Sequence, residues 1–246
     1  MKTLNQYIKE KLIINKNYRD NKIVVKSFDE LRKIIEDRYD KLGPGTKQNP
    51  IDFNDIDTSK ITSFDKLFNR LNFEYIDISL WDTSQVDSMM NMFYSCEKLV
   101  SIGDIGEWDV SNVKTFRGMF FDCVILKSIG DLTDWKVTDK LTDTTVMFCM
   151  CYKLKNIGDI GGWEMKNVSN TCQMFQRCDE LEYIGDVSSW DLGNVKSMSG
   201  MFYGCKNLND IGDLSKWKKP KGFRRNFYFE DIFKESSIKN TPDWAF

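Results

Sequence analysis

The sequence has 246 residues, and 41% of them are hydrophobic, which is enough apolar material for the core of one large domain. It contains no histidine, and this excludes catalytic Ser-His and Cys-His pairs and histidine metal sites. The formal net charge is only −2, yet residues 51–215 hold 15 basic and 26 acidic groups, while both ends of the chain are basic. An acidic body of this kind favours a positively charged partner.

The first 50 residues are predicted to form an N-terminal cap. Leu4, Tyr7, Ile8 and Leu12 share one face of a predicted helix, and residues 23–25 suggest a short strand. The run Ser27-Phe28-Asp29-Glu30 is a capping box, which predicts a helix through Leu42 that ends at the Gly-Pro-Gly of residues 43–45. The opening residues lack the apolar core of a signal peptide, and no run reaches the roughly 18 apolar residues of a membrane helix. We therefore expect a cytoplasmic protein that does not bind membranes.

Residues 51–217 contain an internal repeat. The tryptophans at 81, 108, 135, 163, 190 and 217 are 27, 27, 28, 27 and 27 residues apart. Four more columns keep this period: a Met-Phe pair, a Cys three residues later, a Leu three residues after the Cys, and a Gly-Asp pair. The 28-residue spacing places one inserted residue between Trp135 and Leu141. Five columns with one period predict a stack of about six coils.

Each coil is predicted to combine a helix with a short strand. Between Ser111 and Cys123 the apolar residues recur at three- and four-residue intervals, which is typical of one helix face. Residues 126–132 are expected to be extended, with a turn at Gly130-Asp131. The predicted fold is therefore an α/β, right-handed leucine-rich-repeat solenoid, with caps at residues 1–50 and 218–246.

The repeated unit resembles the BspA-like leucine-rich repeats of bacterial surface proteins. The resemblance lies in the pattern Trp-Asp-Val-Ser-Asn-Val, then Met-Phe, Cys, Leu and Ile-Gly-Asp, as in residues 108–131, and it runs from about Trp81 to Trp217. It implies a solenoid that binds other molecules, often as an adhesin. In lacking a leader, the chain is similar to copies of these proteins that are found in anaerobes and their phages.

The Cys, Trp and Met-Phe columns are interpreted as core. A leaderless chain implies a reducing compartment, five cysteines in line cannot all pair, and there is no metal-binding spacing. We therefore expect no metal or other cofactor and buried free thiols.

Two sets of charged residues are candidates for partner binding. The first is the aspartate column Asp104, Asp131, Asp159, Asp186 and Asp213. These carboxylates either cap turns or form a strip for a basic partner or a cation, and calcium is disfavoured because no further ligands accompany each aspartate. The second set follows the last repeat and comprises Lys218, Lys219, Lys221, Arg224 and Arg225. Basic residues among aromatics fit either nucleic-acid contact or a capping segment.

These observations favour a non-enzymatic protein-binding repeat protein with a basic protein or nucleoprotein as partner. Together with the resemblance to phage-borne copies, they suggest an inhibitor of a host nucleic-acid-handling or defence system, similar to an anti-CRISPR protein. The alternatives are a surface adhesin of the BspA type and an RNA or DNA binder that works through the basic ends.

Overall fold

The structure, a computed structural model, describes residues 22–224 and 228–245. The named elements are strands β1 (Ile23–Val24), β2 (Ile51–Asp52), β3 (Ile56–Asp57) and β4 (Ile76–Asp77), helix α2 (Phe28–Leu42), and the one-turn 3₁₀ helices η1 (Leu132–Asp134), η2 (Leu214–Lys216) and η3 (Asp243–Ala245). Strand β1 pairs with β3 and β2 pairs with β4, both in parallel. The N-terminal amphipathic stretch and Arg225 lie outside the described residues.

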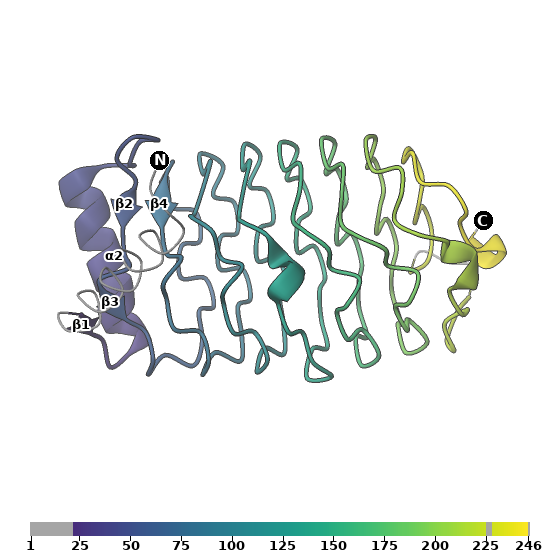
Figure 1. Cartoon of the computed structure of the whole chain (residues 1–246), viewed down its shortest axis with the longest axis horizontal. Coiled ribbons are helices and arrows are strands. Elements are labelled where there is room, and N and C mark those ends of the chain that lie inside the picture. The colour runs from purple at the N-terminus through teal and green to yellow at the C-terminus, as the bar shows by residue number, and fades with distance from the viewer. Residues whose placement is uncertain (1–21, 225–227, 246) are drawn as a thin grey trace, which may run out of the picture.

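The chain forms a row of stacked coils along the long axis of the molecule (Figure 1). Parallel bridges join equivalent residues of successive coils, for example Ser88 to Thr115 and Thr115 to Asp143. Between them, every second amide of one coil donates to a carbonyl of the next, as in Phe93 to Met119 at 2.8 Å and Phe120 to Met147 at 2.8 Å. The predicted repeat fold with a period of 27 residues is thus present as coils that share backbone hydrogen bonds.

The predicted helix within each coil is wrong. Among the described residues, α-helix is confined to α2, and residues 111–123 form consecutive turns instead. The amide of Met119 donates to Phe116 at 3.0 Å and that of Cys123 donates to Phe120 at 3.2 Å. Gly118 and Asp122 each precede the residue that closes a turn, with φ values of 62° and 60°. A positive φ at this position interrupts a right-handed helix and is typical of a type II turn.

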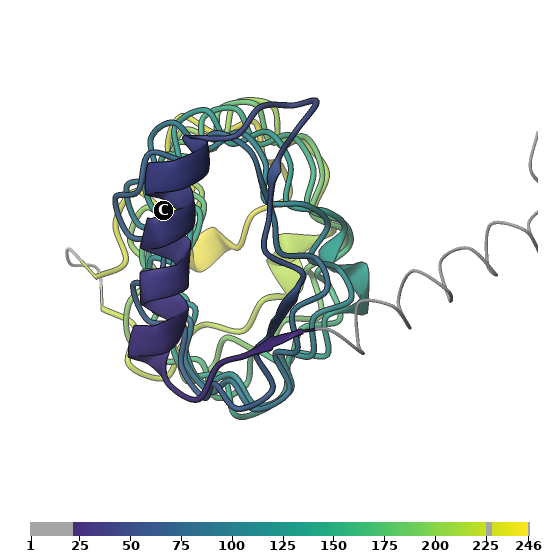
Figure 2. The same cartoon turned by 90° about the vertical axis from the view of Figure 1, so that its left-hand side faces the viewer.

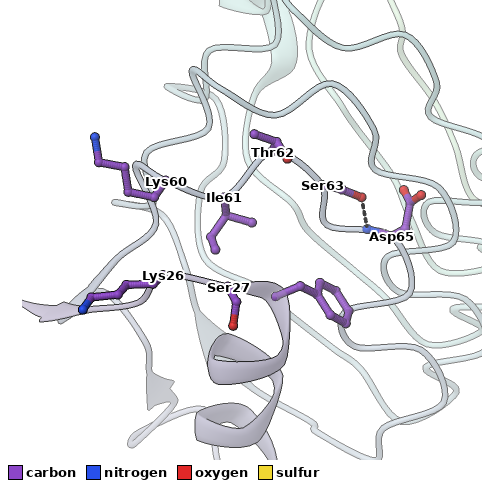
Figure 3. A pocket seen from close by; sticks show the side chains of 8 residues that line it. Lys26, Ser27, Lys60, Ile61, Thr62, Ser63 and Asp65 are labelled. Atoms are coloured by element: carbon purple, nitrogen blue, oxygen red, sulfur yellow. Dashed lines mark hydrogen bonds between the residues drawn. The ribbon is translucent and has the colours of Figure 1, made fainter.

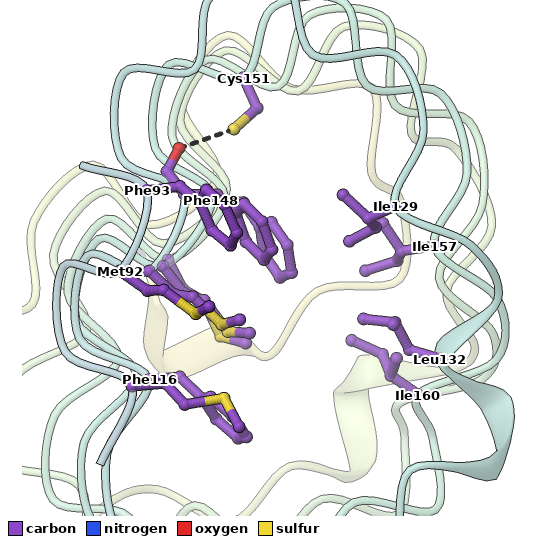
Figure 4. Close-up of a cluster of buried hydrophobic side chains, with 14 of the residues drawn as sticks. Met92, Phe93, Phe116, Ile129, Leu132, Phe148, Cys151, Ile157 and Ile160 are labelled. Carbon is purple, nitrogen blue, oxygen red and sulfur yellow. Dashed lines mark hydrogen bonds between the residues drawn. The ribbon is translucent and has the colours of Figure 1, made fainter. Parts of the chain in front are cut away.

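Stacked phenylalanines form the centre of the core. The rings of Phe68, Phe93, Phe120, Phe148, Phe175, Phe202 and Phe233 follow one another with centroids 5.0–5.7 Å apart and planes within 2–12° of parallel. Figure 4 shows Phe93 and Phe148 with Met92 on one wall of the coils, facing Ile129, Leu132 and Ile157 on the opposite wall. We call these the Met-Phe wall and the Gly-Asp wall, because the Gly-Asp pairs directly follow the isoleucines of the second one.

The tryptophan column is buried and hydrogen-bonded. The indole Nε1 of Trp135 donates to the Ile105 carbonyl at 2.8 Å, and Trp217 donates to Val187 at 2.9 Å. Trp163 follows the 28-residue coil. Among the tryptophans of the described residues, it alone has a buried Nε1 without a hydrogen-bond partner. The extra residue is accommodated just after Trp135, where the amide of Val137 donates back to the Trp135 carbonyl at 2.9 Å in a tight turn.

The cysteine column is buried and free, as expected. Each thiol donates to a phenylalanine carbonyl of the preceding coil, for example Cys123 to Phe93 at 3.1 Å and Cys178 to Phe148 at 3.1 Å. Burial raises the pKa of the Cys96 thiol to about 12, so it stays protonated. The thiols therefore fill the core and also satisfy carbonyl groups.

Helix α2 covers the N-terminal end of the stack (Figure 2). Its start at Ser27 is confirmed, because the Ser27 hydroxyl accepts from the Glu30 amide at 3.2 Å. The Glu30 carboxylate accepts from the Lys26 amide at 2.7 Å, one residue earlier than a capping box requires. Leu31 and Ile35 are buried against the first coils, and Arg38 forms an ion pair with Asp55 at 2.7 Å.

The last described residues add a further row to the stack. The amides of Met198, Gly200, Phe202 and Gly204 donate to the carbonyls of residues 228, 230, 232 and 234. The indole of Trp244, 27 residues after Trp217, donates to the Trp217 carbonyl at 3.1 Å. The segment after Trp217 therefore follows the geometry of the coils, which its sequence only weakly indicates.

Candidate interaction surface

The aspartate column forms turns on the outside of the Gly-Asp wall. One carboxylate oxygen, Oδ1, accepts the amide two residues further on: Gly106 to Asp104 at 3.0 Å, Gly161 to Asp159 at 2.9 Å and Ser188 to Asp186 at 2.9 Å. Asp131 and Asp213 do the same at 3.0 Å and 3.2 Å. The turn-capping alternative therefore describes what one oxygen of each carboxylate does.

The glycine of each Gly-Asp pair packs against the aspartate of the coil before it. Gly185 has a φ of 82°, and a methyl group placed on it would overlap the Asp159 carboxylate. Gly130 and Gly212 meet Asp104 and Asp186 in the same way. The pair recurs because the position needs a positive φ and has no room for a side chain.

A second acidic column follows the tryptophans. Asp82 and Asp109 each accept the amide of a serine two residues further on, at 3.0 Å, and Asp191 accepts that of Gly193 at 3.0 Å. Hydrogen bonds from Ser111 lower the pKa of Asp109. The two positions are five residues apart in each coil and flank the same stretch of chain; after Trp135 the second position is Lys136 instead of an acidic residue.

The excess acidity of the repeats is confined to this stretch. We define the acidic strip as residues 52–59, 77–84, 104–111, 131–138, 159–166 and 186–193. It holds fourteen acidic residues and two basic ones, whereas the rest of residues 51–215 holds twelve acidic and thirteen basic residues. Most of the strip carboxylates are exposed. Within the strip, Asp55 is paired with Arg38 of helix α2 at 2.7 Å. Outside the strip, charges are paired between coils, as in Lys114 with Asp87 at 2.8 Å and Lys153 with Glu180 at 2.6 Å.

The sign of the strip reverses in the last coil. Residue 216 aligns with Glu107 and Asp134, and residue 218 aligns with Asp82, Asp109 and Asp191, but both are exposed lysines. Lys219 lies 4.6 Å from the centre of the Phe223 ring, and Lys221 donates to the Asn194 side chain at 3.2 Å. Arg224 is exposed, and Phe223 packs on Phe229, which is buried. The basic candidates thus lie beside the acidic strip but not within it, and the aromatics near them cover the core.

Two hollows border these surfaces. One, of about 610 Å³, lies on the strip beside the inserted residue and is lined by Glu107, Trp108, Asp109, Asp134 and Lys136 among others. The other, of about 390 Å³, lies at the start of α2, where Lys26 and Lys60 flank Ser27 and Ile61 (Figure 3). In the described ranges no group of three or more Cys, Asp or Glu side chains is arranged to hold a metal ion. No helix in that part of the chain is long and apolar enough to span a membrane.

The turns of the aspartate column predict how stability depends on pH. Hydrogen bonds from the hydroxyl and amide of the residue two positions later lower the pKa of Asp131, Asp186 and Asp213. A lowered pKa in the folded state adds stability that is complete above the unfolded value of about 3.9 and is lost as the pH falls through the folded value. We expect the free energy of unfolding, measured with urea, to fall below about pH 4. Replacing all three by asparagine keeps an acceptor for each amide and is expected to flatten this decline; an unchanged slope would contradict the assignment.

Repetition, stacked hydrogen bonds and ladders of like residues define a repeat protein of stacked coils. Residues 44–157 and 147–241 match a family described as "Mycoplasma protein of unknown function, DUF285", and the chain belongs to this family. The match supports the resemblance to BspA-like leucine-rich-repeat proteins.

A solved structure also resembles part of the chain. It is the crystal structure of a leucine-rich repeat protein from Bacteroides ovatus, with 18% sequence identity and a TM-score of 0.34, and the alignment covers 80% of this chain and 48% of that one. This chain therefore spans about half the length of that protein. The comparison with curated proteins gives no match.

Sequence reasoning found the aspartate column but missed the acidic strip. The net charge of the repeats showed an excess of carboxylates without showing where they lie. When the repeats are aligned and the charge is summed at each repeat position, the excess carboxylates fall between the Gly-Asp pair and the residue that follows each tryptophan. The additional aspartates Asp52 and Asp77 also take part, each capping a turn in the earliest coils.

Proposed function

We propose that this protein is a non-enzymatic binding protein whose acidic strip binds a basic protein, and that its coils form a right-handed solenoid of the leucine-rich-repeat kind. The observation that carries this proposal is the uneven charge: the strip holds the whole acidic excess of the repeats, and the rest of residues 51–215 is close to neutral. Potentials of one sign on an elongated surface steer partners of the opposite sign and fix their orientation.

The strip is preorganised for such a partner. Most of its aspartates accept a hydrogen bond from a backbone amide, so these side chains lose little freedom when they bind. The coils beneath them are joined by backbone hydrogen bonds along the whole stack. A rigid surface of this kind suits recognition of another macromolecule, which is the usual role of stacked repeats.

Inhibition of a host nucleic-acid-handling or defence system, of the anti-CRISPR kind, stays a prediction from the sequence, as does a location in the cytoplasm. Attachment to a surface, as by an adhesin, is an alternative outcome of the test below. Nucleic-acid binding by Lys218, Lys219, Lys221 and Arg224 is another.

Two matched variants test the proposal. The strip variant carries Asp104→Asn, Asp131→Asn, Asp159→Asn and Asp186→Asn, which remove four charges and keep the acceptors of the turns. The control variant carries Glu97→Gln, Glu182→Gln, Asp210→Asn and Glu230→Gln, which remove four exposed charges outside the strip.

Each protein is used to capture partners from a nuclease-treated lysate of the producing organism, and the captured proteins are identified by mass spectrometry. We expect the wild type and the control variant to retain the same basic proteins and the strip variant to lose them. Equal capture by all three would refute a role of the strip. Proteins captured only from a parallel lysate without nuclease would instead indicate the basic end, and capture of envelope proteins alone would favour the adhesin.

A further inference from the structure

One junction between neighbouring coils has a different core from the others. We call the contact between residues 143–151 and 170–178 the Thr junction, because Thr144 and Thr171 are fully buried there. In the other coils the same position is held by larger apolar side chains, which are also fully buried: Phe64, Met89, Phe116 and Met198. A threonine buries less apolar area than a phenylalanine or a methionine, so the Thr junction gains less from burial than its neighbours.

Two buried polar groups next to this junction have no hydrogen-bond partner in the described part of the chain. One is the Thr171 Oγ1, whereas the Thr144 Oγ1 donates to the Asn170 carbonyl at 3.4 Å. The other is the Nε1 of Trp163, which lies in the segment that links the two sides of the junction. Such groups lose their hydrogen bonds to water on folding and regain them when the structure opens, so both favour opening.

Val146 adds backbone strain at the same place. Its φ is 50°, in the left-handed region that a β-branched residue rarely adopts. The equivalent residues of other coils are not β-branched: Asn91, Gly118, Gln173 and Gly200. The Val146 amide donates across the Thr junction to the Cys172 carbonyl at 2.9 Å, so this contact holds the strained conformation and opening of the junction releases it.

The backbone ladder across the Thr junction is complete in spite of these features. The amides of Phe148 and Met150 donate to the carbonyls of Met174 and Gln176 at 2.9 Å and 2.8 Å. The rings of Phe148 and Phe175 stack with centroids 5.5 Å apart. The junction is therefore closed in the folded protein, but its core and its strain make opening easier than at a junction with the same ladder and a larger apolar core.

We propose that the stack opens first at the Thr junction, which separates a segment that ends at residue 151 from one that begins at residue 170. In stacked repeats each interface contributes separately to stability, so the weakest interface opens while the coils on either side stay folded. The first segment keeps helix α2 as its cap, and the second keeps the row that follows Trp217. An otherwise rigid binding surface thereby has one place at which it bends.

Native-state hydrogen exchange of the full chain, followed by mass spectrometry of overlapping peptides, tests the inference. The amides that donate across the Thr junction lie in residues 144–150, and those of the two neighbouring junctions lie in residues 116–122 and 171–177. After correction for intrinsic rates, we expect residues 144–150 to exchange at least about tenfold faster than the other two groups. Rates that agree within about twofold at all three junctions would overturn the inference.

A variant that relieves the strain makes the test specific. Val146→Gly places at this position the residue that two other coils have there, and it is expected to slow the exchange of residues 144–150 about tenfold. Val124→Gly is the matched control, because Val124 is half-buried as Val146 is but has a negative φ. We expect this control not to slow the exchange of residues 144–150, and equal slowing by both variants would overturn the inference.

A second pair of variants tests the unpartnered hydroxyl. Thr171→Val removes the hydroxyl and keeps the shape of the side chain, so it is expected to slow the exchange of residues 144–150. Thr83→Val removes a buried hydroxyl that donates to the Asp109 carbonyl at 2.9 Å, and it is expected to speed exchange around residue 83. Unchanged exchange of residues 144–150 in both Val146→Gly and Thr171→Val would overturn the inference.

Discussion

Truncating Phe148 to alanine is expected to lower the free energy of unfolding by about 4 kcal/mol. Phe148 is fully buried, and its ring stacks on Phe120 and Phe175 with centroids 5.5 Å away on either side. The truncation removes the apolar ring and leaves a cavity in the middle of a continuous column, where rigid neighbouring coils prevent collapse. Urea denaturation followed by tryptophan fluorescence measures the loss.

Two further variants make this test specific. Phe148→Leu fills most of the cavity and is expected to cost roughly 1–2 kcal/mol. Tyr183→Ala removes an aromatic ring of similar size that is 45% exposed, and it is expected to cost less than about 1 kcal/mol. A loss for Phe148→Ala no greater than that for Tyr183→Ala would contradict the stacked core.

Replacing Gly185 by alanine is expected to cost about 3 kcal/mol. The backbone at Gly185 has a φ of 82°, which strains any residue with a Cβ, and the added methyl group would overlap the carboxylate of Asp159. The strain and the overlap add, because the first arises from the residue's own backbone and the second from the coil before it. The change is measured by urea denaturation at neutral pH.

Gly162→Ala is the matched control, since Gly162 has no atom within 4 Å of an added Cβ. It is expected to change stability by less than about 1 kcal/mol. In the double variant Asp159→Ala/Gly185→Ala the overlap with the carboxylate is gone. The stability loss of the double variant is therefore expected to be about 1 kcal/mol smaller than the sum of the losses of the two single variants. Strict additivity would show that the overlap with the carboxylate adds nothing to the loss.

The sequence allowed the period, the buried columns and helix α2 to be predicted, because each depends on local or strictly repeated signals. The capping residue Ser27 and the Gly-Pro-Gly after Leu42 mark the ends of α2 correctly. The inserted residue after Trp135 was also located, since one longer spacing in an otherwise constant period admits few positions.

The conformation of residues 111–123 could not be predicted in the same way. Apolar residues three and four positions apart point to one side of a helix, but they also point to one side of consecutive turns. What separates the two is a positive φ at Gly118 and Asp122, and at Val146 and Met150 in the next coil, and only the first of these four residues is a glycine. The stacked hydrogen bonds between coils impose that conformation, so it is a property of the array and not of the local sequence.

The role of the aspartates could be predicted only in part from the sequence. The alternatives of turn capping and partner binding were both open, and the structure shows that capping uses Oδ1 of each carboxylate. The continuation of the stack beyond Trp217 was missed because Ile232-Phe233 replaces Met-Phe and follows Phe202 at an interval of 31 residues. The one clear signal was Trp244, which keeps the 27-residue period.

The hydrogen bonds between coils have a consequence for how such a protein can change over generations. Each coil meets only its two neighbours, and every internal junction is built from the same columns, so duplication or loss of one 27-residue unit restores an equivalent junction. A gene that gains a unit therefore gains a coil without redesign of the rest, and the exposed anionic surface grows by two or three carboxylates. The number of repeats therefore sets the length of the stack, and with it the length of partner surface that the protein can contact, in steps of about 5 Å.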